Sequence, residues 1–409
     1  MTPLATTLPL CPIPEGDAWL RQKVERSVDF LLHAVDRDAL ETVILTGSTA
    51  RGEASVLPVS SGFRLLGDLE FLVIARAPFD WPRLRRQMTV LSDRATQAIG
   101  AAGREAVIEY GPAGRVYLQH NIRPCIFAYD LRTHGQVVWG QPDILSDITP
   151  FEVGEIPSED ALNLLMNRLI ERLLGSRTAP VTALAEHFGK AYGAVKFILE
   201  AAGSALASAS GHVSLYRERG RCFDDLLHAE PTLASALSDL DDFRHWLKVA
   251  IACKLEPSSP RLDDLQQALP LAQCANWGCE LWLWQMRRWL DGTPDFHEAL
   301  EAYLRRESVV SRLKGWTKFF RHPLRPQGTL SWPRLARLLP QSSPQTLTYA
   351  SALLLLAGLT ETGSPDGYQR VRALLPVSCN VLPARCEALQ NEQLVDAIGE
   401  LWTWLIRNN

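Results

Sequence analysis

The 409-residue sequence has no long apolar run, no paired metal-ligand spacing and no excess of basic charge. Its longest apolar stretch, 351–358, is far shorter than the roughly 20 residues that cross a bilayer. The N-terminus also lacks the basic start and apolar segment of a secretory signal. We therefore predict a cytoplasmic protein without a transmembrane segment. A net charge of −4 gives no global reason to expect nucleic-acid binding, although a local basic groove is compatible with it.

The cysteines and histidines show none of the spacings typical of a zinc site or a disulfide framework. The eight cysteines are scattered without a C-x-x-C pair, and no two of the nine histidines stand four residues apart. A reducing compartment is therefore favoured. Cys274 and Cys279 lie in an apolar, tryptophan-rich stretch, and we interpret them as small buried hydrophobic residues. Core packing is also predicted for the tryptophans of this stretch, Trp277, Trp282, Trp284 and Trp289.

The pattern along the chain changes near residue 150. Before it, helical periodicity alternates with short β-branched runs, and after it the pattern is helical almost throughout. We predict an α+β fold with three parts: a catalytic domain over 1–150, a helical domain over 151–300 and a C-terminal helical region over 301–409. In the first part we expect helices at 15–36 and from Pro82, and strands at 42–46, 68–74, 106–110, 124–130 and 136–139.

Two features of the first part indicate chemistry on phosphates. The strand at 42–46 runs into Gly47-Ser48, and such a turn at a helix start directs N–H groups and a hydroxyl at one point, which suits an anion. Asp68 and Glu70 begin the next strand, and residues two apart on a strand point to the same face. Carboxylates are the hard oxygen ligands that Mg²⁺ prefers. A phosphate-binding turn beside paired carboxylates is what metal-assisted transfer from a nucleoside triphosphate requires.

This pattern resembles the nucleotidyltransferase superfamily, which includes DNA polymerase beta-like, antibiotic and minimal nucleotidyltransferases. The resemblance covers residues 20–150 and rests on an apolar strand, G-S-T-A-R-G-E at 47–53, a spacer and D-L-E at 68–70. It implies a mixed β-sheet with flanking helices, followed here by an all-α region. It also implies binding of ATP or another nucleoside triphosphate, and Mg²⁺-dependent transfer of the nucleoside monophosphate to an acceptor hydroxyl with release of pyrophosphate. The spacer is longer than in the minimal enzymes, and the second acid is Glu rather than Asp.

The resemblance assigns roles to the motif residues. Gly47 and Ser48 would hold the triphosphate, and Asp68 and Glu70 would ligate two Mg²⁺ ions. Arg51 and Gly52 would brace the helix that follows the turn, and Arg51 would also contact the nucleotide.

A third acid completes the site in this family. The candidates are Glu109 in the strand at 106–110 and Asp130 at the end of 124–130. Glu109 is preferred for both catalysis and metal binding because the strand–helix–strand order matches the family.

The helical part offers further candidates. Lys196, followed by Tyr216, resembles nucleotide-closing elements of polymerase-like relatives, where the lysine would neutralise triphosphate charge and the tyrosine would stack on or hydrogen-bond the nucleotide. The basic stretch 305–337, with interleaved aromatic residues, is read as a solvated interdomain face, or as a surface for an anionic partner.

Two alternative functions stay open at this point. One is a catalytically inactive nucleotide-binding or scaffold protein of the same fold. The other is a tailing polymerase, against which the acidic net charge argues. For the unknown acceptor, a small molecule or a protein is favoured over nucleic acid.

Overall fold

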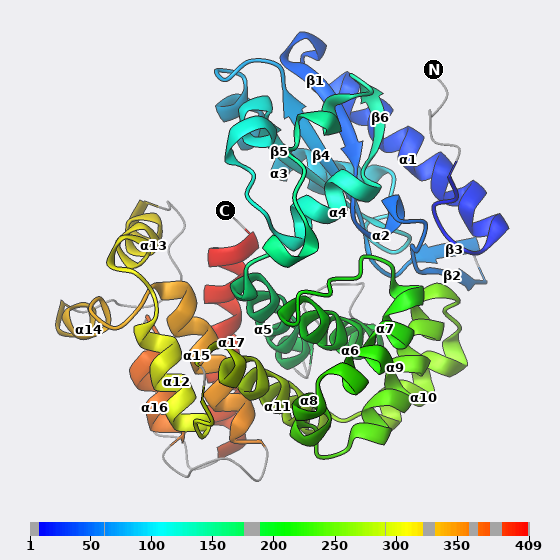
Figure 1. The fold of residues 1–409 in the computed structure, drawn as a ribbon. Helices are drawn as coiled ribbons and strands as arrows, with labels where there is room; N and C mark the ends of the chain where they lie inside the picture. The colour runs from blue at the N-terminus through cyan, green and yellow to red at the C-terminus, as the bar shows by residue number, and fades with distance from the viewer. Residues whose placement is uncertain are drawn as a thin grey trace. The chain divides into compact units, whose positions relative to one another are not determined.

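The computed structural model describes residues 8–60, 62–175, 189–290, 292–321, 332–359, 367–376 and 387–407 (Figure 1). They form two compact units that interleave along the chain. Unit 1 comprises the described residues of Met1–Ala161, Pro180–Leu226 and Arg244–Gln267, and unit 2 those of Leu162–Ala179, Leu227–Phe243 and Ala268–Asn409. This division differs from the three consecutive segments predicted from sequence, because segments far apart in the chain share a core.

Unit 1 is built on a four-stranded sheet in the order β5-β4-β1-β6. Its strands are β1 (Leu40–Leu45), β4 (Asp68–Ala75), β5 (Val107–Gly114) and β6 (Gln136–Gly140). β1 pairs antiparallel with both β4 and β6, whereas β4 and β5 run parallel. A parallel pair needs a crossover, and α3 (Trp81–Ala98) provides it. The mixed α+β class predicted for this part is confirmed.

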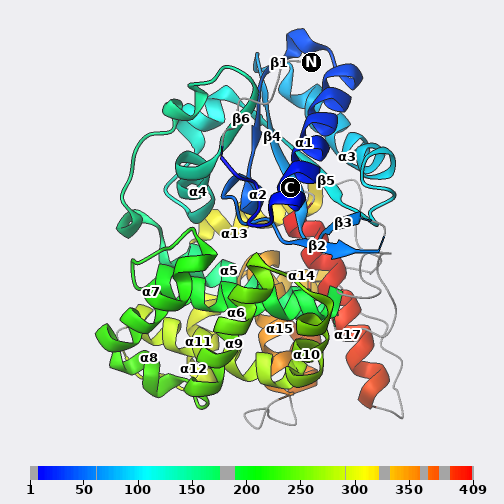
Figure 2. The same ribbon diagram turned by 90° about the vertical axis from the view of Figure 1, so that its right-hand side faces the viewer.

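Helices cover both faces of this sheet. α1 (Pro14–Ala34) and α3 lie on one face and α4 (Ile126–His134) on the other (Figure 2). Side chains alternate along β4: Leu69 and Phe71 share a core with α1 and α3, whereas Leu72 and Ile74 pack in a second core with Leu131 of α4. Both faces of β4 are therefore buried along most of its length.

Two local predictions of the first part were wrong or incomplete. Residues 124–130 do not form a strand, because α4 occupies most of this range. Side chains satisfy its first N–H groups: the Asp160 carboxylate accepts from Ile126 N at 2.6 Å, and Cys125 Sγ accepts from Ala128 N at 3.3 Å. The long spacer after the Gly-Ser turn contains an unpredicted hairpin of β2 (Val56–Val59) and β3 (Gly62–Leu65).

The helices that follow complete unit 1. Short turns lie at η1 (Arg37–Ala39), η2 (Tyr117–Asn121), η3 (Ile144–Asp147) and η4 (Val153–Glu155). Most of the remaining residues of unit 1 fall in α2 (Gly47–Ala50), α6 (Gly189–Ser208), α7 (Tyr216–Ala229), α9 (Leu240–Leu255) and α10 (Ser259–Ala268). The predicted candidate Lys196 lies on α6, and 176–188, which precede this helix, lie outside the described residues.

Unit 2 is helical in its described residues. Its elements are α5 (Ser158–Gly175, of which the first turn, up to Ala161, belongs to unit 1), α8 (Pro231–Ala236), α11 (Leu271–Trp289), α12 (Phe296–Arg305), α13 (Val309–Arg321), α14 (Trp332–Leu338), α15 (Pro344–Ala357), α16 (Gly367–Leu374), α17 (Glu387–Trp402) and η5 (Thr403–Arg407). The helical C-terminal region predicted from the sequence is confirmed. Within the described ranges, no helix combines the length and apolar composition that a bilayer span needs.

The tryptophan-rich helix α11 lies in the core of unit 2. Trp277 and Trp282 are fully buried, and Cys274 and Cys279 are buried without a disulfide. The prediction that this stretch packs in the core is confirmed for these residues. Trp284 is buried as well, and Trp289 is half-buried.

Candidate metal and nucleotide site

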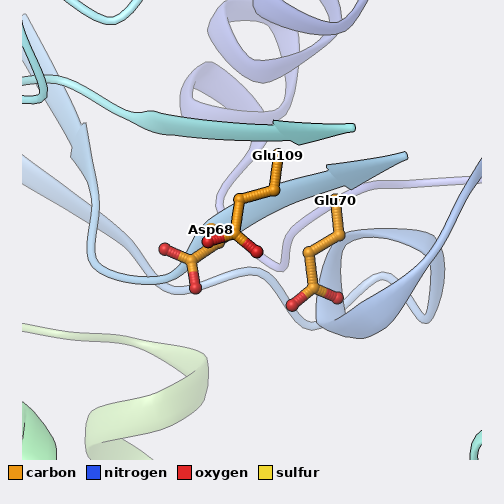
Figure 3. Close-up of side chains that lie close together, drawn as sticks. All are labelled: Asp68, Glu70 and Glu109. Atoms are coloured by element: carbon orange, nitrogen blue, oxygen red, sulfur yellow. The ribbon is translucent and has the colours of Figure 1, made fainter. Parts of the chain in front are cut away.

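Three carboxylates meet where β4 begins. In the parallel pairing of β4 with β5, Asp68 stands opposite Val107 and Glu70 opposite Glu109. The two-residue period places Asp68 and Glu70 on one face, and the register places Glu109 beside them on that face. One ligand oxygen from each residue lies within 4.8 Å of the others (Figure 3). The sheet itself therefore positions all three acids.

The three acids lie on the face of the sheet that also carries the core formed with Leu131 of α4. Along β4 they stand nearer to the N-terminal end of the strand than the residues of that core. Leu72 and Ile74, farther along the strand, are covered by the α4 layer. Asp68 and Glu70 are only half-buried, and Glu109 is exposed. The carboxylates are thus held by largely buried strands while they stay partly exposed to solvent.

The structure places Glu109, not Asp130, with the predicted acid pair. Asp130 lies on α4 and contacts other partners: Arg51 Nη1 donates to its Oδ2 at 2.8 Å, and Ser214 Oγ donates to its Oδ1 at 2.6 Å. His212 Nε2 lies 2.9 Å from the same Oδ1. Asp130 is therefore a half-buried ion-pair partner of Arg51 rather than a member of the acid cluster.

The donor set suits a hard divalent cation. Three carboxylates this close concentrate negative charge, which a bound cation would offset. Oxygen ligands match Mg²⁺ or Mn²⁺, while the sulfur and imidazole ligands typical of structural zinc are missing from the cluster. The Asp68 carboxylate makes no hydrogen bond or ion pair to any other described residue. The residues present thus fit the metal that the sequence pattern implies.

The Gly-Ser turn lies directly against one of these acids. Thr46, at the end of β1, donates its N–H to the carbonyl of Glu70 at 2.9 Å. Gly47 has a φ of +67°, and a Cβ there would collide with the Glu70 carboxylate. Only glycine meets both conditions without strain. The Ser48 hydroxyl is half-buried and has no hydrogen-bond partner among the described residues, so it is available to a ligand.

Lys196 and the buried Tyr192, both on α6, form a cluster with Lys254 of α9. Its ammonium lies 5.5 Å from the ring centre of Tyr192. The Tyr192 hydroxyl donates to Ser55 Oγ at 3.0 Å, accepts from Lys254 Nζ at 3.0 Å, and lies 3.7 Å from where a Cβ of Gly67 would be. Gly67 directly precedes Asp68, so this cluster packs behind the start of β4. Burial would raise the pKa of Tyr192, but the charges of Lys254 and Lys196 lower it overall.

The side chains of Arg51 and Tyr216 contact each other. Arg51 Nη2 donates to the Tyr216 hydroxyl at 3.2 Å, and this hydroxyl donates to Glu200 Oε1 at 2.8 Å. Tyr216 is buried, with 8% of its surface exposed. Both side chains are occupied by protein partners, so we do not carry their predicted direct nucleotide contacts into the proposal below.

Several side chains of the basic stretch 305–337 pack or form hydrogen bonds within unit 2. Trp316 and Phe319 are buried, so these aromatic residues do not interleave with the basic side chains at the surface. Arg334 Nε donates to the carbonyl of Leu375 at 3.0 Å, close to the end of α16. Arg325 lies outside the described residues. A role for this stretch in partner binding stays a prediction.

Sequence reasoning missed several buried polar residues of unit 1. Glu53 stood within the Gly-Ser motif, which gave a local signal of importance but not of its partner. Lys254 and His212 had no such signal, because each meets its partner only through long-range packing.

Comparison with known protein families, with curated proteins and with solved structures finds no match. Support for a function therefore comes from the site itself.

Proposed function

We propose that unit 1 carries a Mg²⁺-dependent nucleotidyltransferase domain of the nucleotidyltransferase fold. The observation that carries this proposal is the convergence of Asp68, Glu70 and Glu109 beside the Gly47-Ser48 turn. Either feature alone is common in proteins. Together they bring three carboxylates that could hold a cation next to N–H groups that could bind phosphate, at adjacent ends of β1 and β4. This combination supports transfer of a nucleoside monophosphate.

The residues have separate roles in the proposed reaction. The backbone N–H groups and hydroxyl of Gly47-Ser48 bind the β- and γ-phosphates of a nucleoside triphosphate. Asp68, Glu70 and Glu109 would hold up to two Mg²⁺ ions, which when bound supply positive charge to the phosphates and acidify the acceptor hydroxyl. The ammonium of Lys196 lies 5.5 Å from the Tyr192 ring, whose hydroxyl is close to Gly67, and it would add positive charge toward the phosphate chain.

The proposed transfer exchanges one P–O bond at the α-phosphorus for another. An acceptor oxygen attacks the α-phosphorus in line, a P–O bond forms to the acceptor, and the bond from the α-phosphorus to the bridging oxygen breaks. Pyrophosphate leaves with that oxygen, and the proton of the acceptor hydroxyl passes to Glu109, the most exposed of the three carboxylates. Catalysis consists mainly of positioning and charge neutralisation.

Calorimetric titration tests the proposal. Each of the four nucleoside triphosphates is titrated into the whole protein with Mg²⁺, and Mn²⁺ alone is titrated with detection by electron paramagnetic resonance. We expect metal-dependent binding of at least one triphosphate and its loss in the double variant Asp68→Ala/Glu70→Ala.

A matched control lies at the opposite end of the sheet. Asp147 accepts from Arg115 Nε at 2.8 Å, and Arg115 follows Gly114, which pairs with Ala75 at the far end of β4. Asp147→Asn therefore removes a carboxylate from the same unit without touching the site, and should bind metal and nucleotide like wild type. Absence of triphosphate binding by the wild-type protein would refute the proposal. Metal-dependent binding without pyrophosphate release for any acceptor class would instead favour the inactive nucleotide-binding protein.

A further inference from the structure

The acidic residue of the G-S-T-A-R-G-E motif caps a helix far along the chain. Glu53 is fully buried. Its Oε2 accepts from the backbone N–H of Tyr216 at 2.8 Å, and its Oε1 accepts from the N–H and the Nε of Arg217 at 3.2 and 2.9 Å. Tyr216 and Arg217 are the first residues of α7, whose free N–H groups carry partial positive charge. The motif is thus bonded to the N-terminus of α7.

The basic residue of the motif reaches the same point. Arg51 donates through Nη2 to the hydroxyl of Tyr216 and through Nη1 to Asp130 on α4. Its guanidinium also lies 5.1 Å from the centre of the Tyr216 ring. Arg51 and Glu53 therefore hold the backbone and the side chain of one residue, Tyr216.

Backbone hydrogen bonds within the motif connect these two residues to the Gly-Ser turn. The N–H of Arg51 donates to the carbonyl of Gly47 at 3.4 Å, and the N–H of Glu53 donates to the carbonyl of Ser48 at 2.9 Å. Between them, Gly52 has a φ of +73°, and a Cβ there would lie 2.7 Å from the carbonyl oxygen of Pro9. The segment is fixed on every side, so the orientation of the turn depends on where Arg51 and Glu53 are anchored.

We propose that Arg51 and Glu53 are positioning residues for nucleotide binding. By bonding to α7, they hold the peptide planes of Gly47 and Ser48 so that the N–H groups face the polyphosphate chain. This inference rests on the proposed function and adds that the phosphate-binding turn is aligned through the start of α7 rather than by the sheet alone. The alignment is rigid because leaving either buried charge without its partners is costly.

The test compares nucleotide and metal affinity in three variants of the full chain. Glu53→Gln keeps the size of the side chain but removes its charge, and Arg51→Lys removes the fork that contacts two partners at once. Asp224→Asn is the matched control, because Asp224 also lies on α7 but pairs with Arg244 of α9, at 2.8 Å, and not with the motif. Affinities for the Mg²⁺ complex of the preferred triphosphate and for Mn²⁺ alone are measured for each variant.

We expect Glu53→Gln and Arg51→Lys to weaken triphosphate binding by about tenfold or more, which corresponds to about 1.4 kcal/mol. Mn²⁺ affinity should change by less than about twofold, because Asp68, Glu70 and Glu109 are held by the sheet. Asp224→Asn should match wild type in both. Hydrogen exchange of the amides at 47–53 should accelerate in Glu53→Gln and not in the control.

The outcomes separate this inference from the function on which it rests. If wild type binds Mn²⁺ and triphosphate and both motif variants bind triphosphate like Asp224→Asn, the positioning role is overturned and the function stands. An equal loss of Mn²⁺ and triphosphate affinity would also overturn it, since the effect would then be general unfolding. If wild type binds no triphosphate, the proposed function fails and this inference fails with it.

Discussion

Replacing Asp130 by asparagine should lower the stability of unit 1 by about 2–3 kcal/mol at neutral pH. Burial alone would raise the pKa of Asp130, but the hydrogen bond from His212, the charge of Arg51 and the hydrogen bond from Ser214 lower it to about 2. The ordinary value is 3.8, and one pKa unit corresponds to about 1.4 kcal/mol. Asparagine cannot provide this stabilisation, because it carries no charge for Arg51 and turns an N–H donor toward one of its donors.

The dependence on pH has a defined sign. A carboxyl whose pKa is lowered on folding contributes its full stabilisation above the ordinary value of 3.8 and loses it as the pH falls toward 2. The difference between wild type and Asp130→Asn should therefore be constant from pH 7 to pH 5 and fall to about half at pH 3. This pattern distinguishes a charge effect from a packing defect.

Peptide-resolved hydrogen exchange is the suitable assay, because two units make a single unfolding free energy ill-defined. The peptides to follow cover 126–134 and 212–229, with labelling times lengthened at low pH. Asp147→Asn again serves as control: its partner Arg115 is 34% exposed, and such pairs contribute about 0–1 kcal/mol. A change below about 0.5 kcal/mol at pH 7, or one that is the same at pH 3, would refute the reasoning.

Three further changes test other parts of the chain. Gly47→Ala should abolish triphosphate binding and weaken Mn²⁺ binding, because the new Cβ would displace the Glu70 carboxylate; calorimetry showing unchanged binding would contradict the turn's role. Asn167→Ala should destabilise unit 2 by about 2 kcal/mol or more. The reason is that Asn167 Oδ1 accepts hydrogen bonds from two buried side chains, one on α15 and one on α17, at 2.6 and 2.9 Å. Urea titration followed by hydrogen exchange of those two helices measures the loss of stability. Lys254→Met should raise the pKa of Tyr192, because the ammonium is the largest charge that lowers it; the pH dependence of phenolate absorbance, compared with Tyr192→Phe, reports the change.

The local elements of the first 150 residues were predictable because their signals are local. The β-branched run at 42–46 and the alternating start of β4 have the strand period, and Pro82 with its apolar stripe has the helix period. The acid pair followed from that period alone, since residues 68 and 70 share a face on any strand. The short apolar run at 124–130 was misassigned because its length and composition do not separate a strand from a helix. Its helical start is fixed by Asp160, a residue over 30 positions away.

Only the tertiary structure decided which third acid joins the pair and what the charged motif residues do. The sequence by itself placed Gly47-Ser48 next to a strand end, made Asp68 and Glu70 neighbours and left Glu109 and Asp130 as alternatives. The parallel register of β4 and β5 sets Glu109 opposite Glu70, whereas Asp130 forms an ion pair with Arg51 instead. Likewise, Glu53 stands in the motif but is bonded to α7, more than 160 residues later. Strand register and the pairing of buried charges depend on contacts between distant segments, which local periodicity does not encode.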